Sequence, residues 1–442
     1  MMRIIQLTPG SGDFYCENCL RDNVLIKSLR AAGHDAVMVP MYLPVRSDEP
    51  GAEKQEPVFF GGINVYLQQK SALFRKAPAW VDCLFNMRWL LKWVSSKAGM
   101  TRAGGLGEMT VSMLRGIEGR QAKELGKLVD WLAADGAADV VCLSNGLLAG
   151  VAPAIRERLG CPVVCLLQDE DGWLDVLPEP FRGQAWRALS HRGGAIDAFV
   201  AVSDYYKELM QGRLGLADER ISVVHPGIEL AGYGPAEGSP EVPTVGYLSP
   251  MCEPKGLGLL VDAFVRLKGF AGCEKARLRV AGGHAAGDKA FIRQMQERLS
   301  RAGFGKDVEF LGNLDRRGKQ EFLKTLSVLS VPTTRGEAFG LFVLESLAAG
   351  VPVVQPRHGA FVELLDATGG GLLCEPNDAE SLAHQLATLL ADPARARELG
   401  MRGRRAVTDK FSAERMARNM MQVFEAVVDS PSRRPMTEQK NV

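Results

Sequence analysis

The stretch RGEAFGLFVLESLAAGVPVVQP, residues 335–356, decides the fold of this chain. The apolar run LSVLSVP (326–332) comes just before it, and the stretch itself ends in a second apolar run, VPVVQP (351–356). Both runs predict buried strands, and the residues between them predict a helix from about Gly340 to Ala349, with Gly350 as its C-cap. A strand, a helix and a strand in this order indicate one βαβ unit of a parallel sheet.

Two glutamates, Glu337 and Glu345, lie eight residues apart in this unit. Glu337 is expected in the loop before the helix, and Glu345 about 8 Å along the helix axis at 1.5 Å per residue. The free N–H groups and partial positive charge of a helix N-terminus suit a phosphate. Carboxylates on either side of a phosphate would bind hydroxyls, which fits the ribose, diphosphate and hexose of a nucleotide sugar. The alternative is an amphipathic helix with one solvated glutamate and one near the helix dipole.

The same alternation of strand and helix runs outward in both directions. Residues 1–228 contain the strand-like runs RIIQLTP (3–9), AVMVP (36–40), DVVCLSN (139–145), PVVCLLQ (162–168) and DAFVAVS (197–203). Residues 229–242 are rich in Gly, Pro and Ala and predict a linker, after which the alternation restarts over 243–410. We therefore expect two Rossmann-like, doubly wound parallel-sheet domains of the α/β class, with the ligand in the cleft that they face.

Composition narrows the class of protein. The 442 residues carry a formal net charge of +1, so no overall field favours nucleic acid. The nine cysteines are scattered, and no run of about 18 apolar residues occurs, so we expect a reduced, cytoplasmic protein. The six histidines show no metal-binding spacing, and the polar residues 429–442 are expected to be disordered.

Further segments match one family in order and spacing. Together with the two glutamates they resemble the retaining glycosyltransferases of family 4, the group 1 glycosyl transferases, which have the GT-B fold. In that family the C-terminal helix, here 411–428, crosses back onto the first domain. The matching segments are VVHPGIE (223–229), VGYLSPMCEPKGLGLLVDAFVRL (245–267), LRVAGG (278–283), VEFLGNL (308–314), HGAFVELL (358–365), GGGLLCEPND (369–378) and AVTDKFSAERMARNMMQVFEAV (406–427).

The resemblance implies roles for single residues. Glu345 matches the glutamate that accepts the ribose hydroxyls, and Glu337 matches the one near the donor hexose. Lys255 matches the lysine that neutralises the diphosphate. Gly10 and Gly12 match the glycines of the first loop, where the backbone approaches the phosphates. Backbone N–H groups are expected to meet donor oxygens at Phe339, Gly340 and Leu341.

One position departs from the family pattern. The family usually has an arginine five residues before the lysine, and this chain has Pro250 there. A diphosphate leaving group needs positive charge, which proline does not supply, so Arg335 or Arg357 would have to reach the site instead. The departure also keeps a non-catalytic ligand-binding protein among the alternatives.

The segment LLQDEDGWLDVLPEPFR (166–182) should open into the cleft because it follows a strand of the first domain. Asp169 and Asp171 imitate a DxD metal motif, but that motif belongs to a different fold, and we expect no metal and no cofactor. We interpret Asp169 as a base or acceptor-hydroxyl ligand, which with Glu337 and Lys255 makes up the catalytic set, and Asp171 as an acceptor-side residue. The alternative is a solvated turn that caps the next helix.

Two segments have no equivalent in compact members of the family. The insertion at about 61–125 contains three tryptophans and interleaved basic residues over 61–99, which fits a peripheral membrane contact, an acceptor groove or a packed helical hairpin. The loop PGSGDFYCENCLRDN (9–23) offers Asp13 and Tyr15 to an acceptor. Its Cys16 and Cys19 are interpreted as packed residues, with a redox pair or a zinc site as alternatives.

The function expected from the sequence is retaining transfer of a hexose from a nucleotide-sugar donor to a glycan, lipid-linked or small-molecule acceptor. A nucleotide-sugar epimerase or phosphorylase on the same fold is one alternative. A non-catalytic protein that binds nucleotide sugars is the other.

Overall fold

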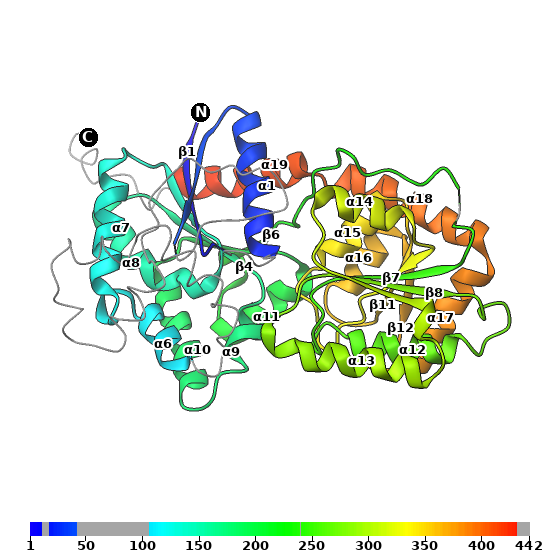
Figure 1. Ribbon diagram of the computed structural model, residues 1–442. Coiled ribbons are helices and arrows are strands. Elements are labelled where there is room, and N and C mark those ends of the chain that lie inside the picture. Colours follow the sequence, from blue (N-terminus) through cyan, green and yellow to red (C-terminus); the bar gives the residue numbers. More distant parts are fainter. Residues whose placement is uncertain (11–16, 42–105, 239, 431–442) are drawn as a thin grey trace, which may run out of the picture.

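The computed structural model describes residues 1–10, 17–41, 106–238 and 240–430, which form two domains side by side (Figure 1). Several sequence predictions lie outside the described residues: those for Gly12, Asp13, Tyr15 and Cys16, those for residues 61–105 of the Trp-rich insertion, and that for the tail from 431. Each domain is built on a six-stranded parallel sheet, so the prediction of two doubly wound sheets is confirmed.

The first sheet has the strand order β2-β1-β3-β4-β5-β6. Its strands are β1 (Arg3–Thr8), β2 (Asp35–Pro40), β3 (Val140–Leu143), β4 (Val163–Leu167), β5 (Ala198–Ala201) and β6 (Ile221–Val223). The helices of this domain are α1 (Glu17–Ala31), α6 (Gly107–Leu114), α7 (Ala122–Ala134), α8 (Ala152–Leu159), α9 (Glu170–Leu174), α10 (Phe181–Arg192) and α11 (Asp204–Leu214).

The second sheet has the strand order β12-β11-β10-β7-β8-β9. Its strands are β7 (Thr244–Leu248), β8 (Arg277–Ala281), β9 (Val308–Leu311), β10 (Val328–Leu329), β11 (Val353–Pro356) and β12 (Gly371–Cys374). Its helices are α12 (Leu257–Leu267), α13 (Lys289–Arg301), α14 (Arg316–Lys324), α15 (Leu341–Ala348), α16 (Phe361–Thr368), α17 (Ala379–Ala391) and α18 (Pro393–Lys410).

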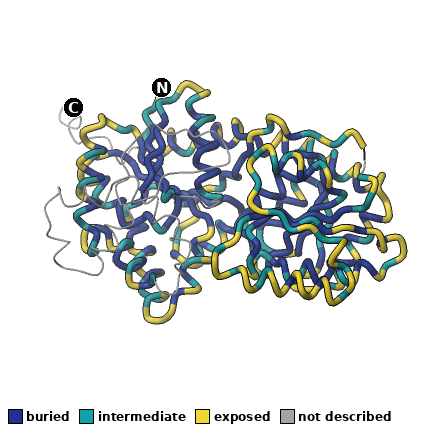
Figure 2. The backbone as a smooth tube through the Cα atoms, viewed as in Figure 1, coloured by how far each residue is buried: buried dark blue, intermediate teal, exposed yellow. Residues whose placement is uncertain are grey.

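The apolar runs of the sequence become the buried strands. Every residue of β3, β4, β7 and β11 is buried, because helices cover both faces of each sheet (Figure 2). The βαβ unit around residues 335–356 forms as expected, although its first strand is only the two-residue β10. Among the described helices, none has the length and apolar character needed to span a membrane.

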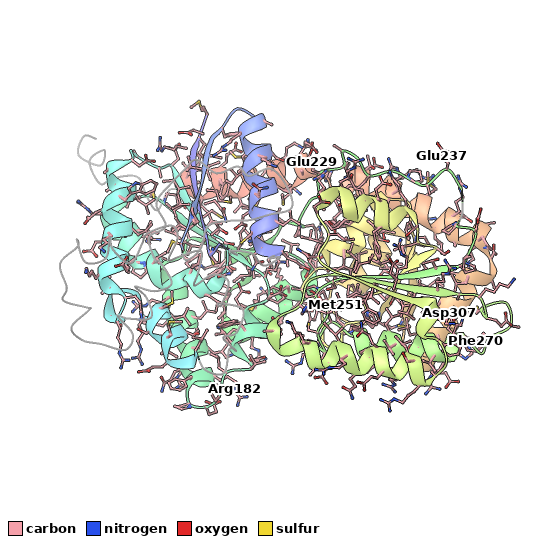
Figure 3. All side chains as sticks on the ribbon, in the orientation of Figure 1. Arg182, Glu229, Glu237, Met251, Phe270 and Asp307 are labelled. Atoms are coloured by element: carbon pink, nitrogen blue, oxygen red, sulfur yellow. The ribbon has the colours of Figure 1, made fainter. Side chains whose placement is uncertain are left out.

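The chain crosses between the domains twice. The first crossing follows β6 and includes Ile228, and the connector that continues from it over the second domain carries Glu229 and Glu237, which Figure 3 labels. The second leads from α18 into α19 (Ala413–Val428), which returns to the first domain and packs beside α1 (Figure 1). The crossings are bonded together, since Ile228 N donates to Phe411 O at 3.0 Å and Ala413 N donates to Ile228 O at 3.0 Å.

Candidate active site

The site lies where the carboxyl ends of the two sheets meet, and its centre is an ion pair. Nζ of Lys255, in the loop after β7, donates to Oε1 and Oε2 of Glu337, both at 2.9 Å. Two glycines without side chains allow the loops that carry these residues to pack closely. A Cβ at Gly256 (φ +75°) would overlap the carbonyl oxygen of Pro332, and one at Gly359 (φ +59°) would press on the backbone of Glu337. The close approach that places Lys255 on Glu337 therefore depends on glycine at both positions.

Helix α15 points its N-terminus toward this ion pair. Gly340, with φ +95°, occupies the N-cap position, and the helix begins at Leu341. The ring of Phe339 packs against His225 and Phe411, at 5.9 and 6.2 Å between ring centroids, and these two rings also contact each other at 5.5 Å. The segment that was expected to bring backbone N–H groups to the donor is thus held rigidly at the junction of the domains.

Glu345 lies further along α15 and is buried. Its Oε1 accepts a hydrogen bond from Tyr233 Oη at 3.0 Å and forms an ion pair with Nζ of Lys319. Sequence analysis did not find Lys319 or Tyr233. Lys319 belongs to the polar helix α14, and Tyr233 lies in the Gly- and Pro-rich connector, so no local pattern marks either of them.

Three carboxyl groups from both domains converge beside Lys255. One oxygen each of Glu17, Asp169 and Glu337 lie within 4.8 Å of one another. Burial raises the pKa of Glu17 to about 8, with the Lys255 ammonium opposing and Glu337 and Asp169 adding to the shift. Burial and then the charge of Glu337 raise the pKa of Asp169 to about 7. Sequence analysis missed Glu17, although an acidic residue that opens the helix after the glycine loop was the available signal.

This carboxyl cluster is the set of described residues that could ligate a metal ion, because hard divalent cations prefer carboxylate oxygens. Lys255 already bonds both oxygens of Glu337, which places a positive charge where such an ion would have to bind. The arrangement fits an ammonium-compensated cluster better than a metal centre. The absence of a metal requirement stays a prediction.

The acidic run after β4 divides into different roles. Asp169 has a left-handed backbone, φ +65°, and its side chain makes no capping bond to α9, so the capping alternative is wrong for this residue. Glu170 is a structural anchor, because it accepts from Gly146 N and from Tyr206 Oη, both at 2.8 Å. Asp171 accepts from the same Tyr206 hydroxyl at 2.9 Å. Of the three, only Asp169 joins the carboxyl cluster.

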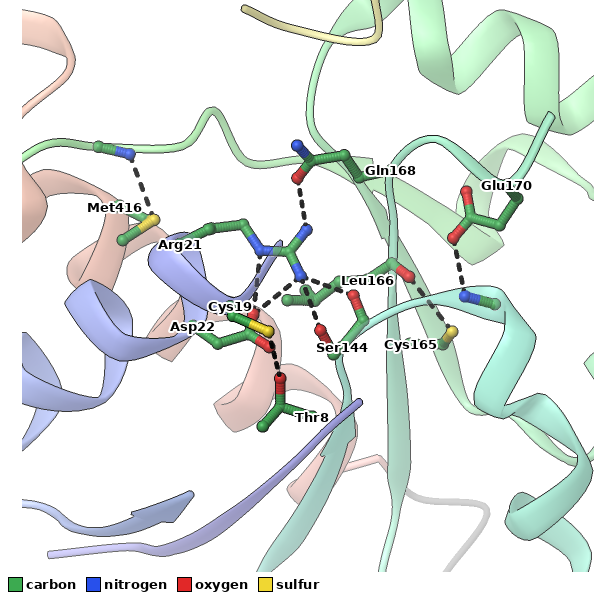
Figure 4. A network of polar contacts seen from close by, with 12 residues as sticks. Thr8, Cys19, Arg21, Asp22, Ser144, Cys165, Leu166, Gln168, Glu170 and Met416 are labelled. Atoms are coloured by element: carbon green, nitrogen blue, oxygen red, sulfur yellow. Dashed lines mark hydrogen bonds and ion pairs between the residues drawn. The ribbon is translucent and has the colours of Figure 1, made fainter. Parts of the chain in front are cut away.

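A buried network fixes the start of α1 against the strand before Asp169 (Figure 4). Arg21 donates to Gln168 Oε1 at 2.8 Å and to Ser144 O at 2.6 Å, and it pairs with Asp22 at 2.8 Å. Cys19 is buried, with its Sγ 3.8 Å from Thr8 Oγ1. Cys19 thus lies in α1 and is packed into the domain, as the sequence analysis favoured for the cysteines of this segment. The zinc and redox alternatives also require Cys16, which lies outside the described residues.

A pocket next to the carboxyl cluster joins the two domains. It reaches from Glu17 of the first domain to Lys319 and Glu345 of the second, and neither Arg335 nor Arg357 contributes to its wall. Both arginines are exposed, and the expectation that one of them reaches the leaving group stays a prediction. The pocket is lined by Glu17, Leu248, Ser249, Pro250, Gly282, Gly283, Asn313, Leu314, Lys319, Phe342 and Glu345.

Comparison with known proteins supports the family indicated by these motifs. Residues 230–406 match the family model described as glycosyl transferases group 1, and residues 111–231 match the model described as glycosyltransferase family 4. A phosphatidyl-myo-inositol mannosyltransferase of Mycobacterium leprae is 32% identical over 46% of this chain and 51% of its own length. A glycogen synthase of Mycobacterium tuberculosis is 26% identical over 69% of this chain and 72% of its own length.

Solved structures agree on the fold. The crystal structure of Anabaena HepE in complex with UDP and glucose matches with a TM-score of 0.68 at 16% identity, covering 96% of this chain and 100% of that one. The chain spans about half the length of most of the curated relatives that it matches. The two family models together match residues 111–406 and support a group 1 glycosyl transferase, and the two parallel sheets have the arrangement of its GT-B fold.

Proposed function

We propose that this protein is a retaining glycosyltransferase that moves a hexose from a nucleotide-sugar donor to a glycan, lipid-linked or small-molecule acceptor. The observation that carries the proposal is the Lys255–Glu337 ion pair at the N-terminus of α15, with Glu345 deeper in the same helix. This arrangement offers, in a row, groups for hexose hydroxyls, a diphosphate and ribose hydroxyls. HepE, a structural neighbour, binds UDP and glucose, and several relatives are named as mannosyltransferases, which supports a nucleotide-sugar donor.

The roles in the proposed reaction follow from charge and position. The α15 N-terminus and the ammonium of Lys255 would stabilise the diphosphate as its bond to the sugar breaks. Glu345 would accept a hydrogen bond from the ribose, while Glu337 and Asp169 would bind hydroxyls of the hexose or the acceptor. Retention would result from attack on the face that the diphosphate leaves, with the departing phosphate taking the acceptor proton. Because the departing phosphate takes the acceptor proton, this scheme needs no metal ion to activate a base.

The test is to incubate the protein with UDP-, ADP- and GDP-sugars and to measure nucleotide release with and without sugar and lipid acceptors. Release that requires an acceptor supports transfer, and NMR of the product then reports the anomeric configuration. Release or interconversion of the donor without an acceptor would favour the epimerase or phosphorylase instead. Unchanged rates in EDTA would support a reaction that uses no metal.

Non-catalytic binding of nucleotide sugars is a second candidate, favoured by Pro250. The described wall of the pocket contains Lys319 but no arginine, so the leaving group would meet less positive charge than the family pattern supplies. Tight nucleotide binding without release from any donor would favour this candidate. A cytoplasmic location and a peripheral membrane contact of residues 61–99 remain predictions.

A further inference from the structure

Helix α14 contacts both the connector and the pocket. The side chain of Asp315 caps the helix by accepting from Gly318 N at 2.7 Å. From its first turns, Arg316 donates to Glu229 O at 3.0 Å and to Ala231 O at 2.8 Å, and Gln320 donates to Ala231 O at 3.0 Å. Lys319 shares this face of the helix, three residues after Arg316, and lines the pocket, where it is only 4% exposed. The helix therefore binds the connector through Arg316 and Gln320 while it presents the buried ammonium of Lys319 to the pocket.

The ammonium and the connector meet at one atom. Lys319 Nζ and Tyr233 Oη both bind Oε1 of Glu345. Because the protein holds Oε1 and Glu345 lines the pocket, Oε2 would be the carboxylate oxygen that accepts from a ligand. A carboxylate fixed in this way can accept a hydroxyl without first losing rotamer entropy.

The charges of the pocket give Lys319 a second task. The pocket is lined by the carboxyl groups of Glu17 and Glu345, and Lys319 is the one positively charged side chain among its described lining residues. Lys255, the nearby ammonium, bonds to Glu337 instead. A nucleoside diphosphate brings further negative charge to this place, and a buried, uncompensated Glu345 would repel it.

We propose that Lys319 is a positioning residue that makes this pocket accept a nucleoside diphosphate, by fixing Glu345 for the ribose and by cancelling its charge. Tyr233 performs the first task only, because its hydroxyl is neutral. The inference rests on the proposed nucleotide-sugar function. It adds a prediction that the proposed function does not make. When Lys319 is replaced, the affinity for the nucleoside diphosphate should fall by a larger factor than the affinity for the nucleoside.

The test compares binding of a nucleoside with binding of its diphosphate. The pairs uridine and UDP, adenosine and ADP, and guanosine and GDP are titrated calorimetrically into the wild-type protein, and the pair that binds most tightly is used for the variants. For Lys319→Met we expect affinity for the diphosphate to fall by about 100-fold and affinity for the nucleoside by about tenfold, since repulsion is added to the lost hydrogen bond. For Tyr233→Phe we expect both affinities to fall by the same factor.

Lys324→Met is the matched control, because Lys324 lies on the same helix and pairs at the surface with Glu321 at 2.9 Å. Thermal unfolding is measured for every variant. If Lys319→Met does not fold, the double variant Lys319→Met/Glu345→Gln removes the charge together with its partner, and both affinities should then fall by an equal factor. Equal losses in Lys319→Met, or unequal losses in the double variant, would overturn the proposal. A wild-type protein that binds none of the diphosphates would overturn the proposed function itself.

Discussion

Lys255 bonds both oxygens of Glu337 at 2.9 Å, so that a lysine from the loop after β7 neutralises a carboxylate from the loop before α15. Burial acts to lower the pKa of Lys255, but Glu337 foremost, and then Glu17 and Asp169, raise it well above its ordinary value. The ammonium is therefore charged throughout the physiological range of pH. One cation thus serves three carboxyl groups and, in the proposed reaction, a diphosphate as well.

Replacing Lys255 by Met should lower kcat/KM for transfer by at least about 100-fold, roughly 2.7 kcal/mol, because the leaving group loses its charge partner. Glu337 would also be left buried without compensation, which costs stability. The double variant Lys255→Met/Glu337→Gln should regain stability but not activity, and Lys275→Met, at an exposed position, is the control. A single variant that keeps wild-type kcat/KM would contradict the role of Lys255.

Glu17 should make the protein less stable as the pH rises. Its pKa is raised from 4.5 to about 8 in the folded state, so the folded protein binds a proton more tightly than the unfolded chain. This contribution is complete below about pH 4.5 and is lost as the pH rises through 8, and Asp169 acts in the same direction up to about pH 7. The midpoint temperature of thermal unfolding should therefore decrease as the pH is raised from 5 to 8.5.

In Glu17→Gln, which cannot ionise, this fall should be smaller. Glu253→Gln is a matched control, because Glu253 is an exposed glutamate in the loop that carries Lys255. Differential scanning calorimetry across this pH range makes the measurement. The same slope in Glu17→Gln and in the wild type would show that the Glu17 carboxyl does not titrate as inferred.

An arginine at position 250 should tighten the binding of nucleoside diphosphates by about tenfold, roughly 1.4 kcal/mol. Pro250 and Glu345 line the same pocket, and the hydrogen bonds to Pro250, from Tyr247 Oη at 2.8 Å and from Cys252 N at 2.9 Å, use only its carbonyl oxygen. The substitution Pro250→Arg therefore keeps both bonds. Calorimetry with a nucleoside and its diphosphate separates the charge effect, since only the diphosphate should gain. Unchanged affinity for both would mean that this position does not face the phosphates.

The two domains are also joined by a carboxylate at the N-terminus of α11. Oε2 of Glu363, on α16, accepts from Asp204 N at 3.0 Å and from Tyr205 N at 3.4 Å, and nearby Ser203 Oγ donates to Ala338 O at 2.7 Å. A carboxylate at a helix N-terminus contributes about 0.3–1 kcal/mol. Glu363→Ala should therefore shift the domains toward a more open arrangement, seen as a larger radius of gyration in small-angle scattering. Glu375→Ala, at an exposed site, should leave the radius unchanged.

Much of the fold could be predicted from the sequence because the strands are short apolar runs and the connections are local. The runs at 139–145, 162–168 and 351–356 each contain an observed strand, and α15 ends within one residue of its expected bounds. These strands and this helix form because their apolar side chains are buried, and apolar residue types can be recognised directly in the sequence.

The partners in the site could not be predicted in the same way. Glu345 meets Lys319, 26 residues away, and Tyr233, 112 residues away, and no periodicity connects the three. Glu17 approaches Asp169 only because the first domain brings the ends of β1 and β4 to one edge of its sheet. Such contacts depend on the tertiary fold. A sequence motif can therefore identify one residue of a contact, such as Glu345, but not the residues that it meets.

The bonding of the two chain crossings at Ile228, Phe411 and Ala413 has a mechanical consequence. With both covalent links joined at one point, a change in the angle between the domains becomes a rotation about a single pivot rather than a sliding of one sheet past the other. Phe339 packs against Phe411 and His225 at this pivot, and Glu337 lies two residues away. The lever arm there is short, so opening the protein to exchange a large ligand would displace the outer ends of the domains far more than the Lys255–Glu337 pair.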